Sequence, residues 1–77
     1  MNYDQEQQKL SARQNRELLK YLLLNESINV FGAINSLNIY RLSARIYDLR
    51  KAGYDITTTM VQLSNRRIAV YKLIENN

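Results

Sequence analysis

Apolar side chains recur along the chain in two different periods, and the change of period divides the sequence. Up to Gly53, leucines and isoleucines follow the three-to-four-residue spacing that one face of an α-helix produces. From Tyr54 onward, the segments YDITTTMVQL and IAVYKLI are rich in the β-branched and aromatic residues of strands. The pattern therefore predicts helices followed by strands, which is an α+β fold.

The first predicted helix begins at Ser11 and ends near Asn25. Ser11 and Gln14 have the spacing of a capping box. The leucines that form its apolar stripe are Leu18, Leu19, Leu22 and Leu23. Residues 1–10 are rich in glutamine and poor in apolar side chains, which predicts a polar, flexible tail before a single domain of residues 11–77.

Two shorter helices are predicted next. Asn29 is a favourable N-cap for a brief helix from Val30, in which Gly32 predicts that another backbone approaches closely. After a turn at residues 37–40, a third helix runs from about Tyr40 to Ala52. Gly53 follows as the residue that ends this helix in a left-handed conformation.

The two strands form a predicted hairpin around the loop SNRR at residues 64–67, which pairs Leu63 with Ile68 and Met60 with Tyr71. One face of this hairpin is expected to pack toward the helices: Ile56, Thr58, Met60, Ala69, Tyr71 and Leu73. The other face is unusually apolar for an exposed surface, and its residues are Val61, Leu63, Ile68 and Val70.

The positive charge of the chain is concentrated in its second part. Residues 1–26 hold four cations and four anions, whereas residues 27–77 hold seven cations and three anions, which accounts for the whole net charge of +4. Six of those seven cations fall in two clusters, at residues 41–51 and 66–67. This asymmetry indicates an anionic partner, and a solvated basic face is the alternative interpretation.

Composition argues against catalysis. The chain has no cysteine, no histidine and only two glycines, so thiolate metal sites, nucleophilic triads and glycine-rich phosphate loops are not expected. No apolar run approaches the length of a membrane span, and the polar N-terminus is unlike a signal peptide. The sequence predicts a cytoplasmic protein that is not an enzyme and has no cofactor or metal.

The segment RLSARIYDLRKAGYDI at residues 41–56, followed by strands that end in AVYKL, resembles the winged helix-turn-helix family. The resemblance extends from about Ser11 to the end of the chain, and it is more specific to small domains common in phage and prophage genes. It implies three helices and a C-terminal β-hairpin wing that bind double-stranded DNA, with the third helix in the major groove and the wing on the backbone or minor groove. The implied role is a transcriptional regulator or an excisionase-like factor.

The third helix can also be interpreted from its own residues. Leu42, Ile46 and Leu49 share one side, which is expected to face the core. Arg45 flanks that side, and its guanidinium is expected to bind Asp48 or a neighbouring helix. The residues predicted to bind DNA lie away from the core or at the hairpin tip: Tyr40, Arg41, Ser43, Ala44, Tyr47, Arg50, Lys51, Arg66 and Arg67.

These residues differ in their expected roles. Arg41 can reach a guanine or a phosphate, and the short Ser43 and Ala44 permit close approach to base edges. Tyr47 either donates to a phosphate or packs between helix and wing. Arg50 and Lys51 suit contacts with backbone phosphates. Asp48 is the residue of this helix that fits an anionic partner least well.

The hairpin tip provides the second basic cluster and leaves one alternative function open. Ser64 and Asn65 already supply turn chemistry, so Arg66 and Arg67 indicate a wing that contacts phosphates or a minor groove. Protection of the hairpin against edge aggregation is the alternative. The chain could instead be a protein-protein interaction module, such as a phage-encoded inhibitor or adaptor, with a homodimer or protein partner bound through Val61, Leu63, Ile68 and Val70.

Overall fold

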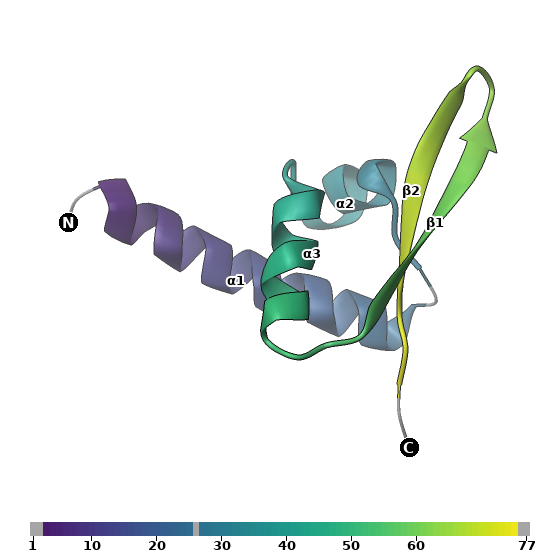
Figure 1. Ribbon diagram of the computed structural model, residues 1–77. Helices are drawn as coiled ribbons and strands as arrows, with labels where there is room; N and C mark the ends of the chain where they lie inside the picture. Colours follow the sequence, from purple (N-terminus) through teal and green to yellow (C-terminus); the bar gives the residue numbers. More distant parts are fainter. Residues whose placement is uncertain (1–2, 26, 76–77) are drawn as a thin grey trace.

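A computed structural model describes residues 3–25 and 27–75 of the protein (Figure 1). It contains three helices followed by a two-stranded antiparallel hairpin, as the sequence predicts for an α+β fold. The elements are α1 (Tyr3–Leu24), α2 (Val30–Leu37), α3 (Leu42–Lys51), β1 (Ile56–Leu63) and β2 (Arg66–Leu73).

Helix α1 ends at Leu24, as predicted, but it begins at Tyr3 and not at Ser11. The segment before Ser11 contains neither proline nor glycine and is rich in glutamine, so nothing in it interrupts the helix. Ser11 lies inside α1, where its hydroxyl accepts a hydrogen bond from Arg45 Nη1 at 2.7 Å. The capping-box interpretation of Ser11 is therefore wrong, whereas the division of the chain at residue 10 into tail and domain stays a prediction.

Helix α2 begins as the sequence predicts. Asn29 is extended, with φ −122°, and its side chain accepts a hydrogen bond from the backbone N–H of Gly32 at 2.9 Å. The close backbone approach expected at Gly32 is wrong, because a Cβ there would meet only the side chains of Ile28 and Asn29, at 3.5 and 3.8 Å. Asn38 ends the helix with a left-handed φ of 57°.

Helix α3 ends in a Schellman motif, which confirms the predicted role of Gly53. Gly53 has φ 105°, and its N–H donates to the carbonyl of Arg50 at 3.0 Å. The N–H of Tyr54 donates to the carbonyl of Leu49 at 3.1 Å. The helix begins at Leu42, so Tyr40 and Arg41 belong to the segment that precedes it.

The hairpin has a different register from the predicted one. Leu63 pairs with Arg66 and Met60 pairs with Ala69, so the loop consists of Ser64 and Asn65 alone. Of the two loop residues only Ser64 has a positive φ, of 53°, and this combination is typical of a type II′ turn. The predicted pairs are displaced by two residues, and a shift of two leaves each side chain on its predicted face.

The base of the hairpin receives one further backbone contact. Ile28, in the segment between α1 and α2, forms an antiparallel bridge with Tyr71 of β2. The two residues exchange N–H to carbonyl hydrogen bonds of 2.8 and 2.9 Å. This bridge fixes the outer edge of β2 to the helical part of the domain.

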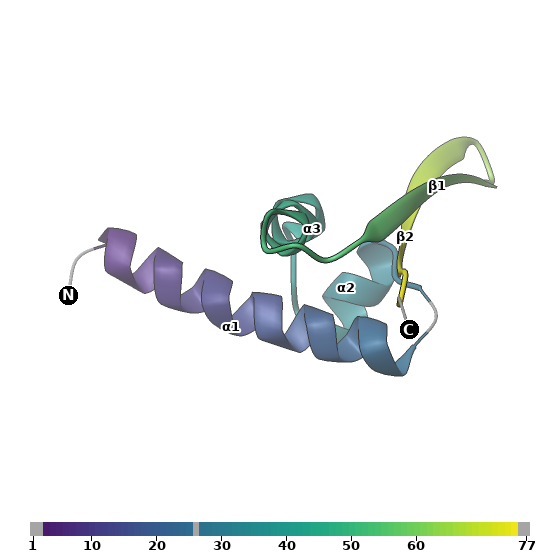
Figure 2. The ribbon, with the colours of Figure 1, turned by 60° about the horizontal axis from the view of Figure 1, so that its bottom comes forward.

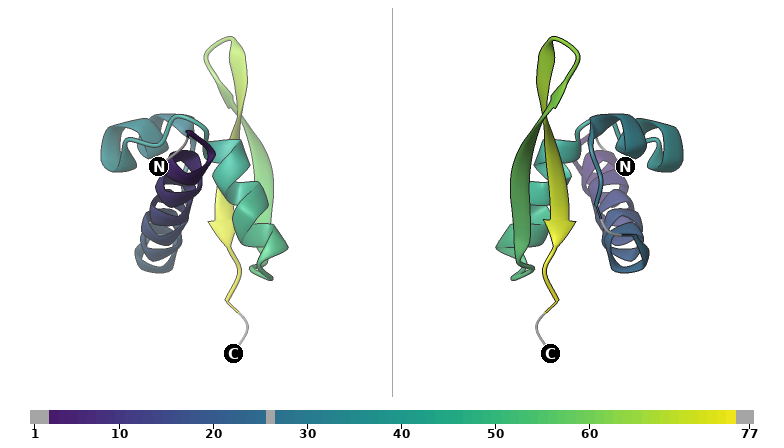
Figure 3. Two further views of the ribbon diagram at one scale, coloured as in Figure 1. Left: turned by 90° about the vertical axis from the view of Figure 1, so that its left-hand side faces the viewer. Right: turned by 90° about the vertical axis from the view of Figure 1, so that its right-hand side faces the viewer.

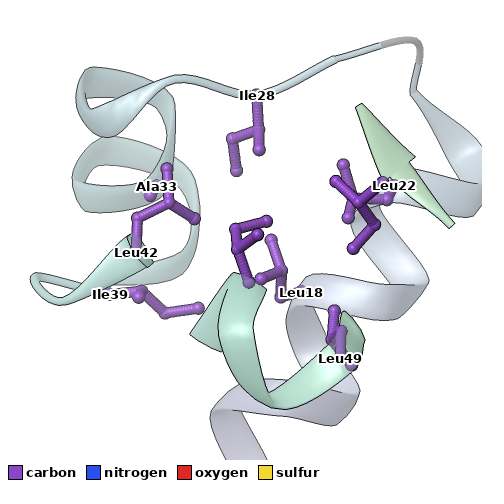
Figure 4. Close-up of a cluster of buried hydrophobic side chains, with 9 residues drawn as sticks. Leu18, Leu22, Ile28, Ala33, Ile39, Leu42 and Leu49 are labelled. Atoms are coloured by element: carbon purple, nitrogen blue, oxygen red, sulfur yellow. The ribbon is translucent and has the colours of Figure 1, made fainter. Parts of the chain in front are cut away.

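The core lies where the three helices meet the base of the hairpin (Figure 4). The predicted α3 stripe is confirmed, since Leu42, Ile46 and Leu49 are all buried. Ile39, expected only as part of a turn, is fully buried as well. The buried hydrophobic residues are Leu18, Leu22, Ile28, Ala33, Ile39, Leu42, Ile46, Leu49 and Ile56.

The arrangement of the elements leaves α3 and the hairpin on one side of the molecule. In Figure 2, α3 is seen nearly end-on, with α1 beneath it and the hairpin rising beside it. Figure 3 shows that the tip of the hairpin extends well beyond the helices. Thr58 and Met60, which were expected to pack toward the helices, are accordingly exposed, and only the base of the hairpin reaches the core.

Candidate nucleic-acid interface

The side of α3 opposite its buried stripe faces solvent. Tyr47 is 65% exposed, although its neighbour Ile46 is 1% exposed. Ser43 is exposed on the same side, and Ala44 is half-buried. Tyr47 therefore does not pack between α3 and the wing, and its hydroxyl is accessible to a ligand.

Tyr40 and Arg41 extend this surface beyond the start of α3. Tyr40 is 68% exposed, and Arg41 is exposed at the N-cap position of the helix. No side chain caps the first turn of α3, and that turn contains no acidic residue. Within residues 3–25 and 27–75, the guanidinium of Arg41 has no hydrogen-bond or ion-pair partner.

Asp48 is bound to α1 by a polar cluster that we call the α1–α3 network, formed by Ser11, Gln14, Asn15, Arg45 and Asp48. Arg45 Nη2 lies 3.2 Å from Asp48 Oδ2, and Asn15 Nδ2 donates to the same oxygen at 3.1 Å. Arg45 Nη1 donates to Ser11 Oγ at 2.7 Å, and its side chain is only 13% exposed. This confirms the expectation for Arg45 and neutralises the acidic group least suited to an anionic partner.

Arg50 and Lys51 differ in their surroundings. Arg50 Nε and Nη2 donate to the carbonyl of Ile56 at 3.0 and 2.6 Å, and Nη2 also donates to Thr58 Oγ1 at 2.7 Å. Lys51 is exposed, and its ammonium has no partner among the residues that the structure describes. The bond from Arg50 to the hairpin could not be predicted from the sequence, since a position in the last turn of a helix equally suits a free cation.

Arg66 and Arg67 are exposed at the first two positions of β2, directly after the loop. Neither guanidinium has a partner in the described part of the chain. Because successive residues of a strand point to opposite faces, the two side chains leave the hairpin on opposite sides. Arg67 shares the face of Tyr71, and Arg66 shares the face of Ile68.

A surface hollow connects the start of α3 with the middle of the wing. Tyr40 and Ser43 form one wall, and Ile68 and Ala69 of β2 form the other. Residues predicted to bind DNA therefore border directly on the hairpin. Helix and wing form one continuous surface.

The outer face of the hairpin is only partly open. Val61 and Leu63 are 40% and 49% exposed, whereas Ile68 and Val70 are half-buried. These residues are the surface that the alternative, protein-binding function would use.

The described residues show neither a metal site nor a membrane span. Across residues 3–25 and 27–75, no three histidine, cysteine, aspartate or glutamate side chains gather where they could hold a metal ion. No helix in this part of the chain is long and apolar enough to cross a bilayer.

Three consecutive helices, an exposed third helix and a basic C-terminal hairpin define a winged helix-turn-helix architecture. The family model described as a winged helix-turn-helix domain matches residues 13–76, and the chain belongs to this family. Membership suggests DNA binding, and domains of this family are typically not enzymes. No curated protein and no solved structure matches the chain.

Proposed function

We propose that the protein binds duplex DNA, with α3 in the major groove and the wing on the backbone or in the minor groove. The observation that carries the proposal is a contrast between the basic and the acidic side chains of helix and wing: most of the described arginines and lysines are unpaired, and the carboxylate of α3 is paired. Arg41 and Lys51 on the helix and Arg66 and Arg67 on the wing are exposed and have no partners in the described residues, whereas Asp48 is neutralised by Arg45. A surface on which the cations are free and the carboxylate is paired with an arginine favours the binding of phosphates.

Individual residues of α3 and of the segment before it have distinct tasks in this proposal. Arg41 binds a guanine or a phosphate, and Ser43 and Ala44 let the helix approach base edges. Tyr47 donates its exposed hydroxyl to a phosphate, and Lys51 contributes charge at the far end of the helix. Tyr40 lies in the segment before α3 and is exposed, so in this proposal it contacts the DNA backbone next to Arg41.

We further propose that the protein is a small cytoplasmic regulator of transcription of the phage type, or an excisionase-like factor. The support is the resemblance of residues 41–56 and of the strands that follow them to small helix-turn-helix domains of phage and prophage genes. A single wing and helix cover little DNA, so tight specific binding would require a second copy or tandem sites.

The partial exposure of Val61 and Leu63 favours one second candidate, a protein-binding module that docks through the outer face of the hairpin. In that case Val61→Glu abolishes binding of the protein partner, and changes on α3 leave it intact. The two functions can therefore be distinguished by whether substitutions on α3 or substitutions on the outer face of the hairpin abolish binding.

Fluorescence anisotropy tests DNA binding with a duplex selected from a random pool and with an unselected duplex of equal length. Arg41→Ala should weaken binding to the selected duplex by about 1 to 3 kcal/mol and weaken binding to the unselected duplex much less. Arg16→Ala is the matched control, because Arg16 is an exposed cation on α1 and the charge change is identical. Equal effects of the two substitutions would refute the placement of α3 against DNA.

A further inference from the structure

We infer that Arg50 is a positioning residue, which fixes the direction of the wing relative to α3 and does not itself contact DNA. The inference rests on the proposed function for its consequence in DNA binding, but its structural part can be tested on the free protein. It concerns the three hydrogen bonds from Arg50 to Ile56 and Thr58.

The acceptor at Ile56 belongs to the open edge of β1. The carbonyl of Asp55 accepts a hydrogen bond from the N–H of Ile74 at 2.8 Å, so this pair faces inward. Backbone groups alternate between inward and outward along an antiparallel strand. The carbonyl of Ile56 therefore points away from β2, and Arg50 satisfies it with two N–H groups.

The aromatic ring of Tyr71 completes the site. The guanidinium carbon of Arg50 lies 5.9 Å from the centre of that ring, within the range of a cation–π contact. Tyr71 pairs with Thr58 across the hairpin, and its backbone bonds Ile28 on the opposite edge. Arg50 and Ile28 thus hold the hairpin base from its two edges.

Small changes at this base are amplified at the tip. From Thr58 to Leu63 the strand rises about 17 Å at roughly 3.3 Å per residue. A tilt of about 20° at the base would therefore move the tip by about 6 Å, since a strand of that length acts as a lever. Such a displacement takes Arg66 and Arg67 out of hydrogen-bond reach of a given phosphate.

Arginine is the residue that this task requires. Its planar group donates two N–H groups to one carbonyl, a further one to a hydroxyl, and stacks on an aromatic ring at the same time. Lysine would keep the charge but could not reproduce this geometry. Substitution by lysine therefore distinguishes a positioning role from a simple charge contact with phosphate.

The first test measures ¹⁵N relaxation order parameters of the hairpin in the free protein. Arg50→Met and Arg50→Lys should both lower the order parameters of residues 57–67 and leave those of α1 and α3 unchanged. Lys51→Met is the matched control, because it removes the neighbouring cation and should leave the hairpin as rigid as in the wild type. A hairpin of unchanged rigidity in both Arg50 variants would overturn the inference.

The second test is a double-mutant cycle on duplex DNA. Arg50→Met alone should weaken binding about tenfold. Without Arg50 the wing adopts more orientations, so a smaller fraction of the molecules holds it in the orientation that binds DNA. In a protein that already carries Arg66→Ala and Arg67→Ala, Arg50→Met should cause no further loss of DNA affinity, because the wing then makes no contact with DNA. Lys51→Met should weaken binding in both backgrounds by the same factor.

The outcomes separate the inference from the function on which it rests. If Arg50→Met weakens binding equally with and without the wing arginines, or if Arg50→Lys binds like the wild type, Arg50 contacts phosphate and the inference is wrong. If the wild-type protein binds no duplex while the order parameters change as expected, DNA binding fails and the structural role of Arg50 stands.

Discussion

Two adjacent residues of α3 provide the most direct test of how this helix is oriented. Ile46 is 1% exposed and lies in the core beside α1, whereas Tyr47 is 65% exposed. Ile46→Ala should destabilise the domain without altering the proposed DNA-binding surface. Tyr47→Ala should do the reverse.

The size of the effect follows from the burial of Ile46. The change removes three buried carbons, which at roughly 0.8 kcal/mol each lowers the free energy of unfolding by about 2.4 kcal/mol. The cavity left behind adds about 1 kcal/mol at roughly 24 cal/mol per Å³. A domain of 77 residues has a stability of about 4 to 12 kcal/mol, so the loss is a large fraction of it.

Urea denaturation followed by circular dichroism measures this loss. Ile46→Ala should lower the midpoint by about 3 M, for a slope of about 1 kcal/mol per M. Tyr47→Ala should change the free energy of unfolding by less than about 0.5 kcal/mol. The same substitution should weaken binding to duplex DNA about fivefold, the equivalent of one hydrogen bond of about 1 kcal/mol.

The opposite pattern would refute the orientation of α3. If Ile46→Ala unfolded at the wild-type midpoint and Tyr47→Ala at a lower one, the helix would be rotated about its axis. The placement of Arg41, Ser43 and Ala44 on the side of the helix that faces away from the core would then be wrong. Ile46→Val, expected to lose about 0.5 to 1.5 kcal/mol, provides an intermediate value for the same site.

Three further variants test other parts of the protein. Replacing Arg66 and Arg67 by alanine should weaken binding to all duplexes alike and lower the slope of log affinity against log salt by about one to two, measured by anisotropy at several salt concentrations. Ala44→Glu should abolish duplex binding in a gel shift while the melting temperature stays near that of the wild type. Arg45→Met should lower the free energy of unfolding by about 1 to 3 kcal/mol in urea, because it breaks the α1–α3 network.

Features set by local chemistry could be predicted from the sequence. The spacing of Leu42, Ile46 and Leu49 is sufficient to orient α3, because a regular helix places these positions on one side. Asn29 and Gly53 have side-chain and backbone properties that suit only a few positions at helix ends. All five residues are found where the sequence predicts them.

Features set by contacts between distant segments could not be predicted. Ser11 has the local pattern of a cap, but the residues before it continue the helix and Arg45 binds its hydroxyl. Ile39 is buried only because the turn that contains it lies against the core. Arg50 bonds the open edge of β1, and no spacing in the sequence distinguishes that role from contact with a phosphate.

The corrected register of the hairpin changes how its arginines can act on DNA. In a four-residue loop, Arg66 and Arg67 would both lie in an irregular tip and could turn toward the same groove. As the first two residues of β2, they leave opposite faces of the strand. They are therefore suited to straddle a phosphate backbone, and a slope change near two would mean that both make contact. A change near one would mean that a single face of the wing lies against the duplex.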